Sequence, residues 1–312
     1  MIKFIENHKI DKEKWDACIH KAFNGIVYAY SWYLDIVAGE WAALVEDDYE
    51  RVMPLPIKSK HGIKYIIQPI FIQQLGVFSV STLNDKIVKS FIDAIPTKYK
   101  FAQVNLNVHN NIFTDSFPIL PRRNYELDLI QTYTRIYSLY SKNCKRNLKK
   151  AEKSKLEITR NIRPEKVIEL FRKNKGLELK EQSEFHYMSL TRLLYESIYR
   201  GHCEVLGVIN EFNEIIAGGA FLVSHHRIIF LFSGNNDEAK NKGAMSFLLD
   251  YCIKTNAGRD MVFDFEGSMD NNLARFYRGF GANETKYYQV VLNRFPFIIK
   301  QFINWIKKLP RK

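Results

Sequence analysis

Two spacings of apolar residues alternate along the second half of the chain. Apolar residues at every second position, or short apolar runs between turn residues, are typical of strands, and apolar residues three and four positions apart are typical of helices. These patterns predict strands at residues 155–160, 203–210, 214–224, 227–233, 261–266 and 285–293. They predict helices at residues 164–174, 186–200, 242–258 and 272–281.

The first half repeats this order of elements. Its strands are predicted at residues 2–6, 41–47, 50–59, 63–71, 101–108 and 122–130, and its helices at residues 11–23, 31–39 and 84–95. Short turns between the middle strands of each half indicate antiparallel hairpins. The order therefore predicts an α/β fold with mixed sheets and helices on both faces, built from two copies of one unit.

The division of the chain that we expect has four parts. Residues 1–130 form the N-terminal half, 131–154 a linking basic helix, 155–293 the C-terminal half and 294–312 an amphipathic C-terminal helix.

The formal net charge of +12 on 312 residues is concentrated in two segments. Residues 142–155 carry seven Lys/Arg against one Glu, and residues 294–312 carry six Lys/Arg and no acid. On a helix the first segment places its cations on one face: Lys142, Arg146, Lys149, Lys150 and Lys153. This face is either simply solvated or an anion site for tRNA, a nucleotide-linked precursor or CoA phosphates.

The segment 294–312 either docks on the protein or lies with its basic face on an anionic membrane surface. The N-terminus lacks the apolar core of a signal peptide, and no run reaches the roughly 18 apolar residues of a spanning helix. The four cysteines are scattered, and neither they nor the histidines have metal-ligand spacing. We therefore expect no metal site and a cytoplasmic location, with peripheral binding at the inner membrane face as the alternative.

The stretch "FDFEGSMDNNLARFYRGFGA", residues 263–282, carries the candidate chemistry. Asp264 and Glu266 alternate with phenylalanines, so both are predicted to point to one face of a strand and to serve as base in amine acylation. The alternative is a structural ion pair or a helix cap. Ser268 is a candidate for capping the next helix or for contacting the substrate. It is not expected to be a nucleophile, because no histidine is placed to activate it. Tyr277 either protonates a leaving group or packs in the core.

Polar and aromatic residues in the first half form a second candidate set. Gln73 and Gln74 lie among bulky apolar residues, where an unpaired amide costs about 1–3 kcal/mol to bury, so they are candidates for binding a polar substrate. A bend is expected near Gly76. Tyr30 and Trp32 are expected to line the cleft that binds this substrate. The alternative is that they pack the two halves together.

The element order resembles the GNAT (N-acetyltransferase) fold, and its doubled form resembles the Fem-type peptidyltransferases and their acetyltransferase-like relatives. The resemblance rests on residues 141–158, 242–268 and 273–282. It implies transfer of an acyl or aminoacyl group to an amine. The implied donor is acyl-CoA or aminoacyl-tRNA, without a tightly bound cofactor, and in Fem-type enzymes the acceptor is a cell-wall peptide.

One loop departs from the family pattern. The GNAT acyl-CoA loop corresponds here to "KNKGAM", in which Lys240 replaces the usual Gln or Arg and Met245 replaces a small residue. Gly243 and Ala244 are still expected to open a helix N-terminus toward a phosphate.

The function expected from these features is acyl or aminoacyl transfer to the amine of a peptide, sugar or small molecule, with a cell-wall or surface-polysaccharide precursor as the leading candidate. The acceptor would bind in a cleft between the halves. One alternative is a non-catalytic module of the same fold that recognises such a precursor. Others are an acetyl-CoA-dependent N-acetyltransferase of a small molecule and a nucleic-acid binder.

Overall fold

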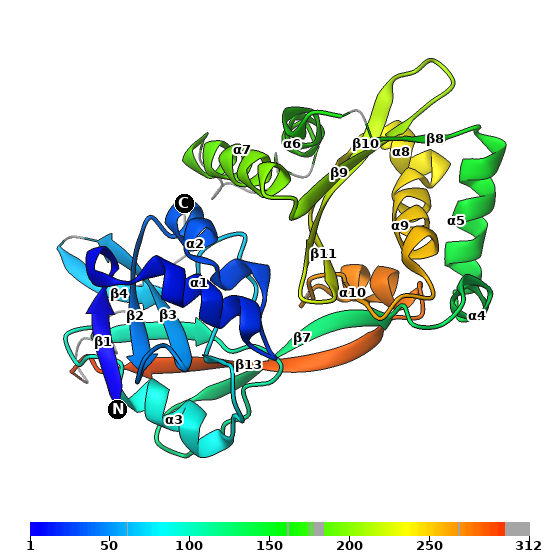
Figure 1. Ribbon diagram of the computed structural model, residues 1–312. Coiled ribbons are helices and arrows are strands. Elements are labelled where there is room, and N and C mark those ends of the chain that lie inside the picture. Colours follow the sequence, from blue (N-terminus) through cyan, green and yellow to red (C-terminus); the bar gives the residue numbers. More distant parts are fainter. Residues whose placement is uncertain (61, 161, 175, 177–183, 268, 297–312) are drawn as a thin grey trace. The chain divides into compact units, whose positions relative to one another are not determined.

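A computed structural model describes residues 1–60, 62–160, 162–174, 176, 184–267 and 269–296 (Figure 1). The predicted amphipathic helix thus lies outside the described residues, apart from its first three. The chain forms two compact units, one from Met1–Pro121 with the chain from Tyr287 onward, the other from Arg122–Lys286. Among the described helices, none is long and apolar enough to span a membrane. The predicted boundaries at residues 130, 154 and 293 stay a prediction.

In its described residues, the first unit combines hairpin strands with the helices α1, α2 and α3. Its strands follow the order β1-β2-β3-β4-β6-β13, in which β4 and β6 are parallel and the other described neighbours antiparallel. Two 3-10 turns, Asn7–Lys9 and Val27–Ala29, complete it. The elements are β1 (Ile2–Glu6), α1 (Lys12–Lys21), α2 (Ser31–Val37), β2 (Glu40–Glu46), β3 (Arg51–Lys60), β4 (Ile63–Ile67), β5 (Phe78–Ser79), α3 (Asp85–Asp93), β6 (Phe101–Asn105) and most of β13 (Asn283–Asn293).

In the described part of the second unit, the strands follow the order β8-β9-β10-β11-β12-β7, in which β11 and β12 are parallel and the other neighbours antiparallel. Its strands are β7 (Ile119–Asp128), β8 (Glu157–Thr159), β9 (Cys203–Ile209), β10 (Ile215–Ser224), β11 (Arg227–Asn235) and β12 (Val262–Asp264). Its helices are α4 (Tyr133–Ser138), α5 (Lys142–Lys153), α6 (Pro164–Arg172), α7 (Glu184–Tyr199), α8 (Asp237–Lys242), α9 (Ala244–Asn256) and α10 (Asn271–Arg278).

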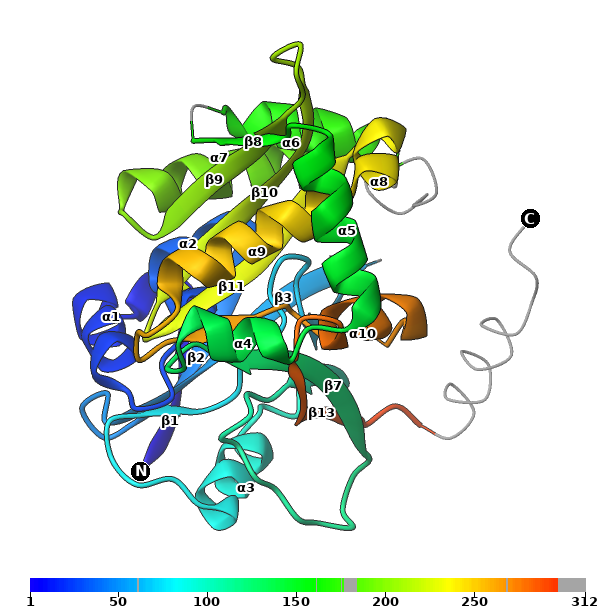
Figure 2. The same cartoon turned by 90° about the vertical axis from the view of Figure 1, so that its right-hand side faces the viewer.

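The predicted fold class and element order are confirmed, including the helix that begins at Pro164, whose fixed φ suits a first helical position. The short elements β5 and α8 were not expected from the pattern, and the segment 131–154, expected as one helix, forms the two helices α4 and α5. In the second unit, α6 and α7 lie on one face of β9, β10 and β11, and α9 with α5 lies on the other (Figures 1 and 2).

The last strand of each predicted half pairs in the other half's sheet. Strand β7 pairs with β12, with Leu127 opposite Phe263, and β13 pairs with β6, with Val290 opposite Val104. Periodicity alone identifies a strand and its buried face, but it does not identify its partner. The exchange was therefore not visible in the sequence.

Each unit buries its own hydrophobic core. Leu55 and Phe91 are fully buried in the first unit, and Phe265 and Phe280 in the second. Burial of each such side chain contributes about 1.5–3 kcal/mol. Phe265 follows β12 directly and Phe280 follows α10, so the core holds the segment around residues 263–282 in place.

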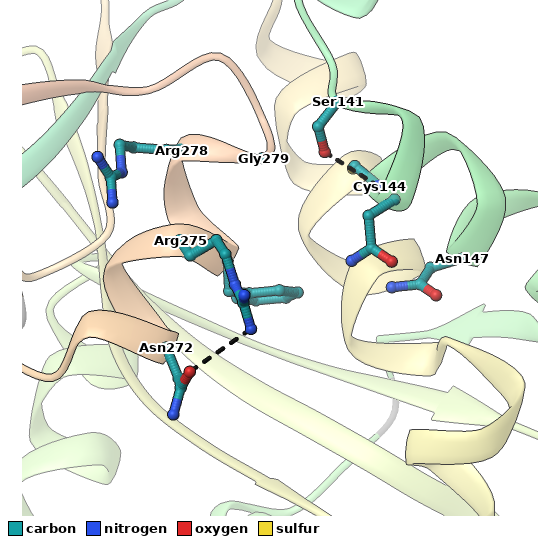
Figure 3. A pocket seen from close by; sticks show the side chains of 9 residues that line it. Ser141, Cys144, Asn147, Asn272, Arg275, Arg278 and Gly279 are labelled. Atoms are coloured by element: carbon teal, nitrogen blue, oxygen red, sulfur yellow. Dashed lines mark hydrogen bonds between the residues drawn. The ribbon is translucent and has the colours of Figure 1, made fainter.

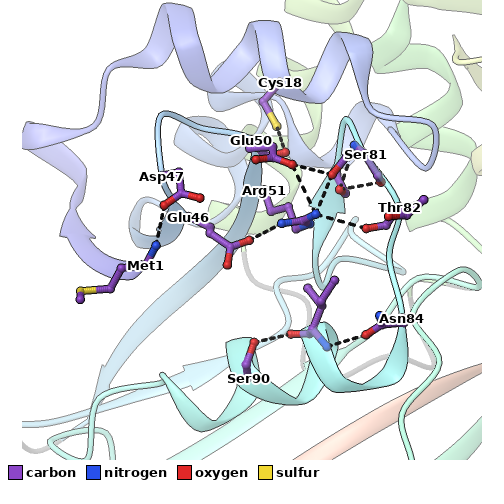
Figure 4. A network of polar contacts seen from close by, with 12 residues as sticks. Met1, Cys18, Glu46, Asp47, Glu50, Arg51, Ser81, Thr82, Asn84 and Ser90 are labelled. Atoms are coloured by element: carbon purple, nitrogen blue, oxygen red, sulfur yellow. Dashed lines mark hydrogen bonds and ion pairs between the residues drawn. The ribbon is translucent and has the colours of Figure 1, made fainter.

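Polar contacts at the start of β3 stabilise the first unit (Figure 4). The Arg51 guanidinium, whose side chain is 14% exposed, contacts Glu46 at 2.6 Å and Glu50 at 3.3 Å. It also donates to the Ser81 hydroxyl at 2.7 Å. The network ties the β2–β3 hairpin to the chain that leaves β5.

Candidate active site

The parallel strands β11 and β12 are paired over only three residues. Arg227 lies opposite Val262 and Ile229 opposite Asp264, where β12 ends, while β11 continues to Asn235. A register shift in the pairing of β10 with β11 leaves an extra residue at Leu231. Beyond Ile229, among the described residues, β11 therefore has a strand partner on one edge only. Such an edge can pair with an extended ligand.

A cavity of about 750 Å³ lies beside this free edge. Its lining combines aromatic and aliphatic side chains with a few amides, hydroxyls and a lysine, which is the usual composition of a small-molecule site. The residues are Asn147, Phe171, Asn174, Phe230, Ser233, Gly234, Asn235, Ala239, Lys240, Gly243, Met245, Ser246, Leu273, Phe276 and Tyr277.

Tyr277 comes to this cavity from α10, which begins where the Asp270 carboxylate accepts from the Asn272 N–H at 2.7 Å. The Tyr277 side chain is 5% exposed, and its ring lies 4.9 Å from that of Phe265. Burial raises the pKa of Tyr277, and the negative charge of Glu266 raises it further. The phenol is therefore protonated at neutral pH and can donate a hydrogen bond or a proton.

Asp264 has the surroundings of a structural residue. It is 1% exposed, and its Oδ2 lies 2.7 Å from Nη1 of Arg227, which also contacts Glu126 at 2.7 Å. Burial raises the pKa of Asp264 against the effect of Arg227, and two acids share one guanidinium. Its Oδ1 accepts from the Glu266 N–H at 2.9 Å. A structural ion pair was the alternative expected for Asp264, and the contact with Arg227 matches it.

The expected alternation of Asp264 and Glu266 along one strand is wrong. Strand β12 ends at Asp264, and Glu266 has a φ of +49°, in the left-handed region that few non-glycine residues adopt. The following Gly267 N–H donates to Asn124 Oδ1 at 2.6 Å, which fixes this turn. Glu266 is half-buried, and its charge and that of Asp264 act on Tyr277. Of these three catalytic candidates, Tyr277 lines the cavity, whereas Asp264 and Glu266 are not among its lining residues.

The three donor-loop candidates lie at the junction of α8 and α9. Gly243 has a φ of +74° and ends α8 as α9 begins, and Lys240 and Gly243 line the cavity. Lys240 belongs to the helix α8, which was not expected, and contacts Asp237 at 2.8 Å. Ala244 is fully buried. A Cβ on Gly243 would stand 2.5 Å from the Asn147 carbonyl oxygen, so α5 crosses here against the backbone.

The predicted substrate-binding residues Gln73, Gln74, Tyr30 and Trp32 lie in the first unit. Gln74 is 2% exposed, and its amide accepts from the Val108 N–H at 3.0 Å and donates to Gln73 at 2.7 Å. Tyr30 and Trp32 are buried with stacked rings 6.3 Å apart. Their contact with a substrate stays a prediction, and Ser268 lies outside the described residues.

The predicted basic helix is confirmed as α5, and its cationic face is exposed. Cys144 and Ala151 are buried on the opposite side. Exposure suits both a solvated face and an anion site, so anion binding by this face stays a prediction. The residues are Lys142, Arg146, Lys149, Lys150 and Lys153.

A second cavity, of about 690 Å³, lies between the start of α5 and α10 (Figure 3). Asn147 and Phe276 line both cavities. Arg275 and Arg278 of α10 were not among the predicted site residues, because an arginine on an amphipathic helix normally marks a solvated face. The lining residues are Ser141, Asn143, Cys144, Asn147, Asn272, Arg275, Phe276, Arg278 and Gly279.

Solved structures with the same architecture cover almost the whole chain. FemX superposes with a TM-score of 0.64 at 10% identity, over 96% of this chain and 99% of its own. L-PGS from Bacillus licheniformis gives 0.57 at 13% identity, over 97% and 98%. The C-terminal domain of a putative lysylphosphatidylglycerol synthetase from Agrobacterium fabrum gives 0.54 at 10% identity, over 92% and 93%.

No family model and no curated protein sequence matches the chain. Identities of 10–13% show likeness of fold rather than of substrate. The chain therefore has the fold shared by these structures, which agrees with the Fem-like, tandem GNAT-type resemblance found in the sequence.

Proposed function

We propose that this protein transfers an acyl or aminoacyl group from an activated donor to an amine, with the reacting carbonyl in the cavity beside β11. The free edge of β11 carries this proposal. A donor that contains amide groups could pair with the backbone between Phe230 and Asn235. The apolar lining would exclude water from the activated bond.

In the proposed reaction the amine nitrogen attacks the donor carbonyl carbon and forms a tetrahedral intermediate. The bond from carbon to the leaving oxygen or sulfur then breaks, and the leaving atom keeps the electron pair and takes a proton from the Tyr277 phenol. The Glu266 carboxylate takes a proton from the attacking nitrogen, and the transfer of this proton to the Tyr277 phenolate after product formation would restore both groups. Asp264 is a positioning residue that holds the Glu266 backbone. Most of the acceleration would come from holding the two reactants together.

For the donor, the likeness of fold to a putative lysylphosphatidylglycerol synthetase favours an aminoacyl group. The acceptor would be the amine of a peptide, sugar or small molecule, with a cell-wall or surface-polysaccharide precursor as our first choice. A cytoplasmic location, with residues 294–312 on the inner membrane face, would bring the protein to a lipid-linked acceptor.

Two other functions have an observation in their favour. Acetyl-CoA-dependent N-acetylation of a small molecule is favoured by the start of α9, where Gly243 and Lys240 line the cavity. A non-catalytic binding module is favoured by the ion pair of Asp264 with Arg227, because it occupies one of the two candidate acids.

A direct assay separates these functions. The full chain is incubated with a radiolabelled aminoacyl-tRNA pool or with radiolabelled acetyl-CoA, together with peptides and amino sugars that carry a primary amine. We expect transfer from one donor, and a loss of about 100-fold in kcat for Tyr277→Phe, which is typical for removal of a general acid. The control is Tyr251→Phe on α9. Binding of an amine without turnover would support the module and contradict the proposal.

A further inference from the structure

The cavity between α5 and α10 has a cationic lining that the acyl-transfer step does not use. Arg275 and Arg278 line it, and its described lining contains no acidic residue. Arg275 donates to Asn272 Oδ1 at 3.5 Å. In the described part of the chain, neither arginine has an ion-pair partner. Figure 3 shows Arg275 on α10 and Asn147 on α5 at opposite sides of the cavity.

The backbone adds positive potential at the same place. The Ser141 N–H donates to the Gly279 carbonyl oxygen at 2.9 Å, and the Ser141 hydroxyl accepts from the Cys144 N–H at 3.2 Å. These bonds hold the first turn of the 12-residue helix α5 against the end of α10. The first turn of α5 thus lines the same cavity as Arg275 and Arg278, and the positive end of its dipole adds to the potential there.

The exposed face of α5 continues this positive surface. Arg146 Nη2 donates to Asn143 Oδ1 at 2.5 Å, and Asn143 lines the cavity. The site therefore offers guanidinium forks, neutral amide donors and further cations at its rim. A guanidinium fork matches the oxygens of a phosphate group, and charge-assisted bonds of this kind are stronger than neutral ones.

We infer that this cavity binds a phosphate group of the acyl donor. The inference rests on the proposed function, because the donor is placed by the acyl cavity, with which this one shares Asn147 and Phe276. The phosphate would belong to a coenzyme or to the end of an RNA. In either case Arg275 and Arg278 anchor the donor while its carbonyl lies beside β11.

Sodium pyrophosphate is the probe for the first test, by calorimetric titration of the full chain at low salt. We expect binding by the wild type and a Kd raised about tenfold or more in Arg275→Ala/Arg278→Ala, since the charge-assisted bonds to the phosphate oxygens are lost. Arg275→Lys/Arg278→Lys keeps the charge, loses the forks and should fall between. Arg259→Ala removes one exposed arginine of the same unit and is expected to bind like the wild type.

Thermal unfolding of each variant checks that the fold is kept. Equal pyrophosphate affinity in the wild type and the double alanine variant would overturn the inference, as would no binding by the wild type. A second titration compares coenzyme A with a short RNA hairpin, and the ligand whose affinity falls in the double variant identifies the source of the phosphate. These titrations measure binding and need no turnover. The phosphate site can therefore be refuted while acyl transfer is found, or supported while acyl transfer is not found.

Discussion

Both units contain a parallel pair of strands inside the sheet, β4 with β6 and β11 with β12. In the first unit the pair is continued beyond the end of β4, because Leu75 bridges to Leu106 in parallel and its N–H donates to the Asn105 carbonyl oxygen at 2.8 Å. In the second unit β12 stops at Asp264 and the edge of β11 faces a cavity.

The amide side chains near these strand pairs also differ between the two units, because they are buried in the first and line a cavity in the second. In the first unit, Asn107 donates to the Leu75 carbonyl at 3.0 Å, and Asn110 accepts from the Val77 N–H at 2.6 Å. Both are buried and hold the segment that fills the gap. In the second unit, Asn147 and Asn174 line the open cavity. The same arrangement of strands therefore has its gap filled in the first unit, and it borders the candidate site in the second unit.

The largest effect on stability is expected from replacing an arginine, and its size should differ between the two units. Arg227→Met should lower the free energy of unfolding by about 3–5 kcal/mol, because it leaves the fully buried Asp264 without its partner. Arg51→Met should cost less, on the order of 1–2 kcal/mol, since Glu46 and Glu50 keep access to water. Urea denaturation followed by circular dichroism measures both, and equal losses would contradict this difference.

A pair of glycines gives the next effect. Gly243 and Gly39 both have positive φ, but a Cβ on Gly243 would stand 2.5 Å from the Asn147 carbonyl oxygen, whereas nothing lies within 4 Å of a Cβ on Gly39. Gly39→Ala should cost about 1 kcal/mol for the left-handed backbone. Gly243→Ala should cost roughly 2–4 kcal/mol, because overpacking is added. If thermal unfolding shows no difference, α5 and α9 are not in close contact here.

The smallest effect on stability comes from exchanging amides for leucine. Gln74→Leu leaves the Val108 N–H without its acceptor and should cost about 1–3 kcal/mol while transfer activity is kept. Asn147→Leu should change stability less and transfer activity more, because its side chain borders both cavities of the second unit. If Gln74→Leu lowered transfer activity and Asn147→Leu did not, the site would lie in the first unit.

Much of the fold could be predicted because each unit repeats strong local patterns. The apolar hairpin strands and the proline that begins α6 have direct signals in the sequence. The exchange of β7 and β13 has none, since a strand pattern does not specify its partner. The predicted bend at Gly76 is confirmed by its φ of +91°.

The candidate site was predicted less completely. Asp264 and Glu266 were identified, but the turn at Glu266 was missed, although the adjacent Gly267 is a turn signal. Arg227 opens an otherwise apolar strand, and a charged residue there could have indicated a partner for Asp264. A substrate contact of Gln74 stays a prediction, and the pairing of its amide inside the first unit could not be seen from the sequence alone.

The most direct test fills a cavity in each unit in turn and measures transfer of a labelled aminoacyl or acetyl group to a peptide amine. Ser233→Trp fills the cavity beside β11, and Ile63→Trp fills a cavity of about 660 Å³ lined by β1, β2 and β4 in the first unit. We predict that Ser233→Trp lowers transfer at least about 100-fold and that Ile63→Trp leaves it unchanged, since displacement of a positioned substrate removes most of the rate. Full transfer by Ser233→Trp, or its loss in Ile63→Trp, would contradict the placement of acyl transfer at the open edge of β11.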